Sequence, residues 1–136
     1  MKKYFYGGHY IDDNDIRSIT LSLNKTLSQG PLIKKFEKNV AKYFNSKYCV
    51  AVSSATAALH ISIAALNLKK NSKVFLPTMT FVATANACIY NKLNLNLIDI
   101  DSNNFNIDLD ILEKKLSKES KREKKLIIPV HFGGLP

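Results

Sequence analysis

The sequence predicts an α/β protein in which helices flank a mostly parallel sheet. Short apolar segments alternate along the chain with helical periodicities, a pattern typical of right-handed βαβ crossovers. Two stretches, residues 48–68 and 74–90, carry no charged side chain. Polar residues interrupt both stretches, mainly serine in the first and threonine in the second, so we interpret them as buried strand-plus-helix units and not as membrane spans.

The first elements that the pattern predicts are two amphipathic helices. Asp12 to Asp15 offers N-cap chemistry, and Gln29, Gly30 and Pro31 end the first helix and precede the second. The first apolar face is Ile16, Ile19, Leu23 and Leu27, and the second is Ile33, Phe36, Val40, Tyr43 and Phe44. We therefore expect residues 1–45 to form an N-terminal helical segment.

Residues 46–136 are expected to form the first part of an α/β domain. The segments that are short, apolar and rich in β-branched residues predict strands at 47–52, 73–76, 93–98 and 125–130. The segments between them predict helices at 55–68 and 80–90. A further helix is predicted to begin after Asp108, with Leu109, Leu112 and Leu116 on its inner face.

Composition excludes several classes of protein. The chain has 136 residues, of which 46% are hydrophobic and 23% charged, which fits one ordinary domain and argues against intrinsic disorder. Cys49 and Cys88 form neither a CxxC pair nor a His/Cys cluster, so we expect neither a disulfide framework nor a metal site. No apolar segment follows the basic N-terminal residues, so a signal peptide is not expected, and we predict a cytoplasmic protein without a membrane partner.

The net charge of +9 raises the question of nucleic-acid binding. Eighteen of the 20 basic residues are lysine, and they are scattered along the chain, whereas sequence-reading and bidentate phosphate contacts favour arginine. The one dense run, residues 114–125, is interrupted by Glu119 and Glu123, as on a solvated helix face. We therefore expect no nucleic-acid partner, although a basic α/β module that binds an anion stays open as a non-enzymatic alternative.

Chemistry is expected in the loops that follow the strands, because ligands of parallel sheets bind outside the carboxyl ends of the strands. These loops are residues 53–56, 77–81, 99–101 and 131–133. The first loop, Ser-Ser-Ala-Thr, runs into a helix start, where free N–H groups and the helix dipole favour a phosphate. A plain helix N-cap is the alternative interpretation of the same residues.

Several segments together resemble a known family. They are SSATAALH at 53–60, PTMTFVATAN at 77–86, LSQGP at 27–31, IDID at 98–101 and IPVH at 128–131. Taken in the order in which they occur along the chain, they resemble the DegT/DnrJ/EryC1/StrS sugar aminotransferases over nearly the whole chain. The resemblance implies the large domain of the PLP-dependent transferase fold type I, which is aspartate-aminotransferase-like, and pyridoxal 5'-phosphate (PLP) as cofactor.

Within the family, the N-terminal residues resemble one subgroup, the UDP-4-amino-4,6-dideoxy-N-acetyl-β-L-altrosamine transaminases of pseudaminic acid synthesis. The residues are Tyr6-Gly7-Gly8, Ile11, Asp15-Ile16 and the LSQGP segment. This resemblance implies transfer of an amino group, from glutamate, to a UDP-4-keto-6-deoxy-N-acetylhexosamine. It also implies a homodimer.

The resemblance assigns roles to individual residues. Ala55 and Thr56 would bind the cofactor phosphate, with Ala55 also near the substrate, and Phe81 would stack on the pyridine ring. His131 is a possible contact of the cofactor ring or the substrate, with a solvated or core histidine as the alternative; for Phe81 the alternative is ordinary core packing. The residues implied to contact the nucleotide sugar are Tyr6, Lys25, Thr26, Leu27 and Ser28.

The family's Schiff-base lysine and the aspartate that protonates the pyridine lie in motifs that this sequence does not contain. The resemblance therefore implies the N-terminal portion of a transaminase, with the rest of the large domain and the small domain absent. We expect no catalytic residue within the 136 residues and no activity from them alone. A relative with histidine in place of that lysine, acting as a PLP-dependent sugar dehydratase, remains an alternative.

Overall fold

The computed structural model describes residues 7–24, 28 and 30–136, and the chain divides into two units, Met1–Ala51 and Val52–Pro136. In the first unit, α1 (Asp13–Leu23) begins with a capping box. The Asp12 carboxylate accepts hydrogen bonds from the Asn14 and Asp15 amides at 2.8 and 3.0 Å, and the Asp15 carboxylate accepts one from the Asp12 amide. Helix α2 (Pro31–Tyr43) begins with a proline, which needs no N–H partner in the first turn.

The strand expected at residues 47–52 is absent, which corrects the sequence-based prediction. The segment is not part of any strand in the described part of the chain, and Tyr48 and Val50 are 76% and 68% exposed. Glu37 Oε1 accepts a hydrogen bond from the Ala51 amide at 2.9 Å and ties the segment to α2. A strand requires a neighbouring strand for its ladder, and the described residues provide none here.

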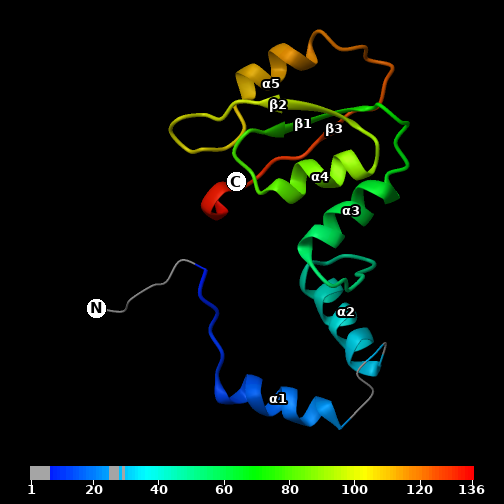
Figure 1. The fold of residues 1–136 in the computed structure, drawn as a ribbon, viewed down its shortest axis with the longest axis vertical. Coiled ribbons are helices and arrows are strands. Elements are labelled where there is room, and N and C mark those ends of the chain that lie inside the picture. Colours follow the sequence, from blue (N-terminus) through cyan, green and yellow to red (C-terminus); the bar gives the residue numbers. More distant parts are fainter. Residues whose placement is uncertain (1–6, 25–27, 29) are drawn as a thin grey trace. The chain divides into compact units, whose positions relative to one another are not determined.

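The second unit contains the predicted α/β alternation (Figure 1). Its elements are α3 (Ala55–Ala65), β1 (Lys73–Pro77), α4 (Val82–Tyr90), β2 (Asn94–Ile98), α5 (Leu109–Leu116), β3 (Leu126–Ile127) and a short 3-10 helix η1 (Phe132–Gly134). The three strands are parallel, in the order β2-β1-β3. The predicted fold class, α/β with a parallel sheet and flanking helices, is confirmed.

Strand β1 is buried on both faces, and successive side chains enter different cores. Val74 and Leu76 pack in a cluster with residues of α3 and α4, including Ile63, Ala87 and Cys88. Phe75 points to the opposite face, where it packs in a second cluster with Ile98, Ile107 and Leu112. Helix α4, with α3 packed against it, therefore covers one face of the sheet, and α5 covers the other (Figure 1).

The last strand is shorter than the sequence predicts. Instead of residues 125–130, β3 has two residues, Leu126 and Ile127, paired with Val74 and Phe75. One more ladder bond follows, from the Ile128 amide to the Phe75 carbonyl at 2.9 Å. Pro129 comes next and has no N–H to donate, so the ladder ends there. Among the described residues, no helix is long and apolar enough to cross a membrane.

Candidate functional site

The carboxyl ends of β1 and β2 have the connections at which ligands bind in parallel sheets. The chain leaves β1 toward α4 on one face and leaves β2 toward α5 on the other, so the two connections diverge. The Thr78 amide donates to the Ile98 carbonyl at 2.8 Å and prolongs the pairing of β1 with β2. Asp99 Oδ1 accepts from the Ile100 amide at 2.8 Å and from the Thr78 hydroxyl at 3.5 Å.

The start of α3 presents unpaired hydrogen-bond donors. Ser54 is the N-cap: its hydroxyl accepts from the Ala57 amide at 3.2 Å, and its carbonyl accepts from the Ala58 amide at 3.0 Å. The amides of Ala55 and Thr56 have no acceptor among the described residues, and the Thr56 side chain is exposed. Two free N–H groups, a hydroxyl and the positive end of a helix dipole fit a phosphate group. The phosphate of PLP fits this donor set.

Phe81 lies outside the core. It holds the N-cap position of α4 with extended backbone, and its side chain is 75% exposed. The residues on either side of it are fixed, because the Thr80 hydroxyl donates to the Thr84 hydroxyl at 2.8 Å and the Thr84 amide donates to the Phe81 carbonyl. The structure therefore does not show the core packing that was the alternative for Phe81. An exposed ring at the end of β1 offers a flat face for stacking.

His131 lines a cavity of about 390 Å³ at the carboxyl ends of β2 and β3. Asn106, from the loop after β2, also lines this cavity and joins that loop to the segment after β3. Its Oδ1 accepts from the Phe132 amide at 3.0 Å, and its Nδ2 donates to the Leu135 carbonyl at 3.2 Å. The rings of Phe105 and Phe132 pack 5.6 Å apart beside this bridge. Asn106 thus holds the segment that carries His131.

A match to a family model shows which protein family the chain belongs to. The model of the DegT/DnrJ/EryC1/StrS aminotransferase family matches residues 9–136. The chain belongs to this family. One relative, the UDP-4-amino-4,6-dideoxy-N-acetyl-β-L-altrosamine transaminase of Campylobacter jejuni, is 37% identical over 131 residues, which is 95% of this chain and 34% of that protein. This chain spans about a third of the length of the relatives it matches.

Solved structures of family members share the fold. The Streptococcus pneumoniae protein Spr1654, described as a sugar aminotransferase and solved in its PMP form, superposes with a TM-score of 0.83 at 26% identity. The match covers 93% of this chain and 31% of that one. The E. coli GDP-4-keto-6-deoxy-D-mannose-3-dehydratase with bound hydrated PLP gives a TM-score of 0.79 at 29% identity, covering 95% and 34%. This chain therefore shares its α/β fold with about a third of the length of these PLP-dependent sugar enzymes.

The structure brings together only part of the residue set that the family resemblance implies. The loop of Asp101, after β2, and the loop of His131, after β3, meet at one cavity at the carboxyl edge of the sheet. Within the described ranges, no hydrogen bond or ring contact joins His131 or Phe81 to the start of α3. Ser28 is exposed, and the other four residues expected to contact the nucleotide sugar lie outside the described residues: Tyr6, Lys25, Thr26 and Leu27.

Asn106 is the site residue that the sequence analysis missed. It belongs to a run of polar residues, Ser102, Asn103 and Asn104 included, that follows the IDID segment. Asparagine-rich loops are common, and nothing in their spacing tells which amide faces another loop. Its position in the chain is the signal that could have identified Asn106. The polar run follows β2, and the carboxyl end of β2 lies at the same edge of the sheet as the end of β3.

Proposed function

We propose that this chain is the cofactor-phosphate portion of a PLP-dependent nucleotide-sugar aminotransferase. The observation that carries the proposal is the start of α3, where the Ala55 and Thr56 amides lack an acceptor within the described residues and the Thr56 hydroxyl is exposed. A phosphate supplies acceptors for all three donors and complements the helix dipole. When bound, PLP supplies the electron sink for amino transfer.

The chain's own residues bind and orient in this proposal. Ala55 and Thr56 hold the phosphate, and Phe81 stacks on the cofactor ring, contributing about 0.5–1.5 kcal/mol beyond the burial of its surface. His131, held by the Asn106 bridge, lies at the same carboxyl edge of the sheet and approaches the cofactor ring or the substrate. No group in the chain is assigned the proton transfer.

We propose a UDP-4-keto-6-deoxy-N-acetylhexosamine as amino acceptor and glutamate as donor. The 37% identical altrosamine transaminase supports this choice of sugar. Tyr6, Lys25, Thr26, Leu27 and Ser28 are proposed to contact the nucleotide sugar, because lysine and hydroxyl groups are strong donors to a diphosphate. A cytoplasmic homodimer is proposed as the working form, with residues 1–45 as a helical segment and residues 46–136 as the first part of the large domain.

The phosphate site is tested by Thr56→Val in the protein that carries this chain. Loss of a hydrogen bond to a charged group should weaken PLP binding by about 1–3 kcal/mol. Equilibrium dialysis measures the affinity directly. Thr56→Ser retains the hydroxyl and serves as the control, with binding close to that of the unmodified protein. Unchanged PLP affinity in Thr56→Val would contradict the proposed site.

The sugar site is tested by Lys25→Ala in the same protein. If Lys25 contacts the diphosphate, its loss raises the KM for the UDP-sugar more than the KM for glutamate. Steady-state kinetics with each substrate varied in turn separates the two effects. Lys38→Ala, on α2, removes the same charge at a position that has no proposed role. Equal increases for both substrates would argue against a nucleotide-sugar contact.

The 136 residues alone are proposed to lack aminotransferase activity, because none of their lysines lies in the family's Schiff-base motif. Titration with PLP followed by borohydride reduction should give no stoichiometric covalent adduct at one defined lysine. Such an adduct, with turnover of an amino sugar, would overturn this part of the proposal.

A sugar dehydratase is the second candidate function, because a PLP-binding dehydratase superposes with a TM-score of 0.79. The two reactions are separated by their products. An aminotransferase leaves nitrogen from glutamate on the sugar, whereas a dehydratase removes water from the sugar. Mass spectrometry of the sugar product with ¹⁵N-labelled glutamate distinguishes them, since only the first reaction incorporates the label.

A further inference from the structure

The edge of the sheet opposite the proposed cofactor site contains a second cavity. Its volume is about 490 Å³, and it lies between the loop that precedes β1 and the loop that precedes β3. We call it the amino-edge cavity. All of its lining residues are polar or charged: Asn67, Lys69, Lys70, Asn71, Ser72, Arg122, Glu123 and Lys124.

The wall before β1 is a fixed loop. Ser72 donates from its amide to the Lys69 carbonyl at 3.0 Å, which closes a turn. The Asn71 amide donates to the Lys92 carbonyl at 2.9 Å, and the Ser72 carbonyl accepts from the Asn94 amide at 3.0 Å. These two bonds tie the loop to the start of β2. Asn71 has φ of 64°, a left-handed conformation that asparagine tolerates better than most residues.

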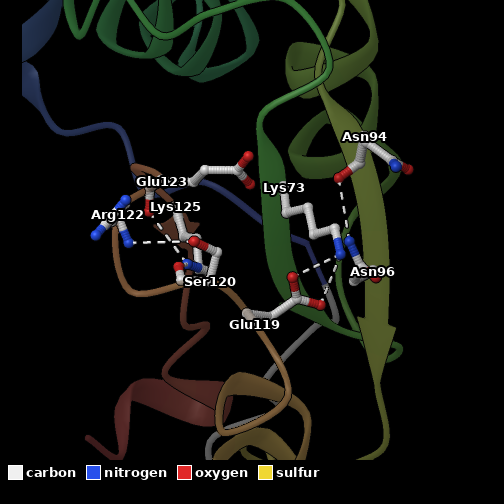
Figure 2. A network of polar contacts seen from close by, with 8 residues as sticks. All are labelled: Lys73, Asn94, Asn96, Glu119, Ser120, Arg122, Glu123 and Lys125. Carbon is white, nitrogen blue, oxygen red and sulfur yellow. Dashed lines mark hydrogen bonds and ion pairs between the residues drawn. The ribbon is translucent and has the colours of Figure 1, made fainter.

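The wall before β3 is attached to β1 by an ion pair (Figure 2). Lys73 Nζ, at the start of β1, lies 2.5 Å from Glu119 Oε2, and the Glu119 side chain is 15% exposed. The turn that follows is closed by the Lys125 ammonium, which donates to the carbonyls of Ser120 and Glu123. The Arg122 amide also donates to the Ser120 hydroxyl at 3.3 Å.

Both walls carry positive charge without matching negative charge. Lys69 and Lys70 come from the first wall and Arg122 and Lys124 from the second, against one carboxylate, Glu123. In the described part of the chain, none of the four cations forms an ion pair. Four cations around one cavity repel one another, and a multivalent anion placed among them removes that repulsion.

We propose that the amino-edge cavity binds a small polyphosphate, of two or more linked phosphates. The Arg122 guanidinium presents a planar fork that matches phosphate oxygens, and the lysines add point charges. Asn67, Asn71 and Ser72 add neutral donors. Among the described residues, no aromatic ring lines the cavity, so the proposal is for recognition of the phosphates and not of a nucleobase. The volume lies in the range of about 300–1,000 Å³ found for small-molecule sites.

This inference does not rest on the proposed function. Ala55 and Thr56 do not line the amino-edge cavity, which lies at the amino ends of the strands. A failure of polyphosphate binding therefore leaves the PLP proposal unchanged, and the reverse also holds.

Isothermal titration calorimetry of the 136-residue chain with inorganic pyrophosphate, tripolyphosphate and orthophosphate tests the proposal. Tripolyphosphate and pyrophosphate should bind more tightly than orthophosphate, at one site. The double variant Lys69→Gln, Arg122→Gln should lose affinity for pyrophosphate by about tenfold or more, since each removes a charged contact. Glu123→Gln should bind pyrophosphate more tightly, a gain that misfolding cannot imitate.

The matched control is Lys114→Gln, which removes one positive charge from the exposed surface of α5, away from the cavity. Its affinity for pyrophosphate should stay within about twofold of that of the unmodified chain. A larger loss would mean that general surface charge, and not the cavity, explains the binding. Three results would overturn the proposal: no pyrophosphate binding, a loss in Lys114→Gln equal to that of the double variant, or tighter binding of single-stranded DNA than of tripolyphosphate.

Discussion

At the scale of single residues, the two cysteines have different surroundings. Cys88 is fully buried between α4 and β1, and its thiol donates to the Thr84 carbonyl at 3.3 Å. Burial in this apolar cluster raises the pKa of the Cys88 thiol above its ordinary value. Cys49 is partly exposed in the segment before the second unit. Because the thiolate is the reactive form, Cys88 should be the less reactive of the two.

The prediction is that a thiol reagent at pH 8 modifies Cys49 in the folded chain and modifies Cys88 after unfolding. The absorbance of the thiolate that the reagent releases follows the modification of both cysteines. The Cys88→Ala variant should lose the slow reaction, which follows unfolding. Burial holds the pKa of Cys88 in the folded chain above its value in the unfolded chain. The contribution of Cys88 to stability is therefore complete below the unfolded pKa and is lost as the pH rises through the folded pKa. Rapid labelling of both thiols in the folded chain would contradict the assigned burial.

At the scale of elements, the helix starts follow from local chemistry. The Asp108 carboxylate accepts a hydrogen bond from the Ile111 amide at 2.8 Å and caps α5. Asp108→Ala should lower the free energy of unfolding by about 1 kcal/mol, measured by urea denaturation. Asp108→Asn keeps a good cap without the charge and should retain most of that stability. If Asp108→Ala and Asp108→Asn lose equal stability, Asp108 does not stabilise the protein by capping α5.

The helices and strands that could be predicted from the sequence are those determined by residues within the element itself. The apolar run Val74, Phe75 and Leu76 indicates a strand buried on both faces, and the structure confirms it. The segment 47–52 is also short and apolar but is not a strand, because strand formation depends on a partner that local sequence does not specify. The Asn106 bridge is missed for the same reason, since it joins loops 26 residues apart in sequence.

At the scale of the whole molecule, large apolar side chains remain exposed. They occur on both units, and on the first unit Ile16, Ile19 and Leu23 of α1 are exposed together with Phe36 of α2. Exposed apolar surface of this kind promotes association. The 136-residue chain should therefore self-associate in a concentration-dependent way, as measured by sedimentation velocity.

A pair of substitutions tests the cause of the association. Phe36→Ser and Ile19→Ser should each shift the sedimentation distribution toward monomer, because they remove exposed apolar surface. Lys38→Gln, on the same helix as Phe36, is the control and should leave the distribution in place. A chain that is monomeric at all concentrations would contradict the prediction.

The central position of β1 has a consequence for amide hydrogen exchange. Its backbone pairs with β2 on one side and β3 on the other, and its alternating side chains belong to the clusters on the two faces of the sheet. Neither helical layer opens without exposing side chains of the same strand. The amides of Val74, Phe75 and Leu76 should therefore exchange with solvent most slowly, and only when residues of the second unit unfold together.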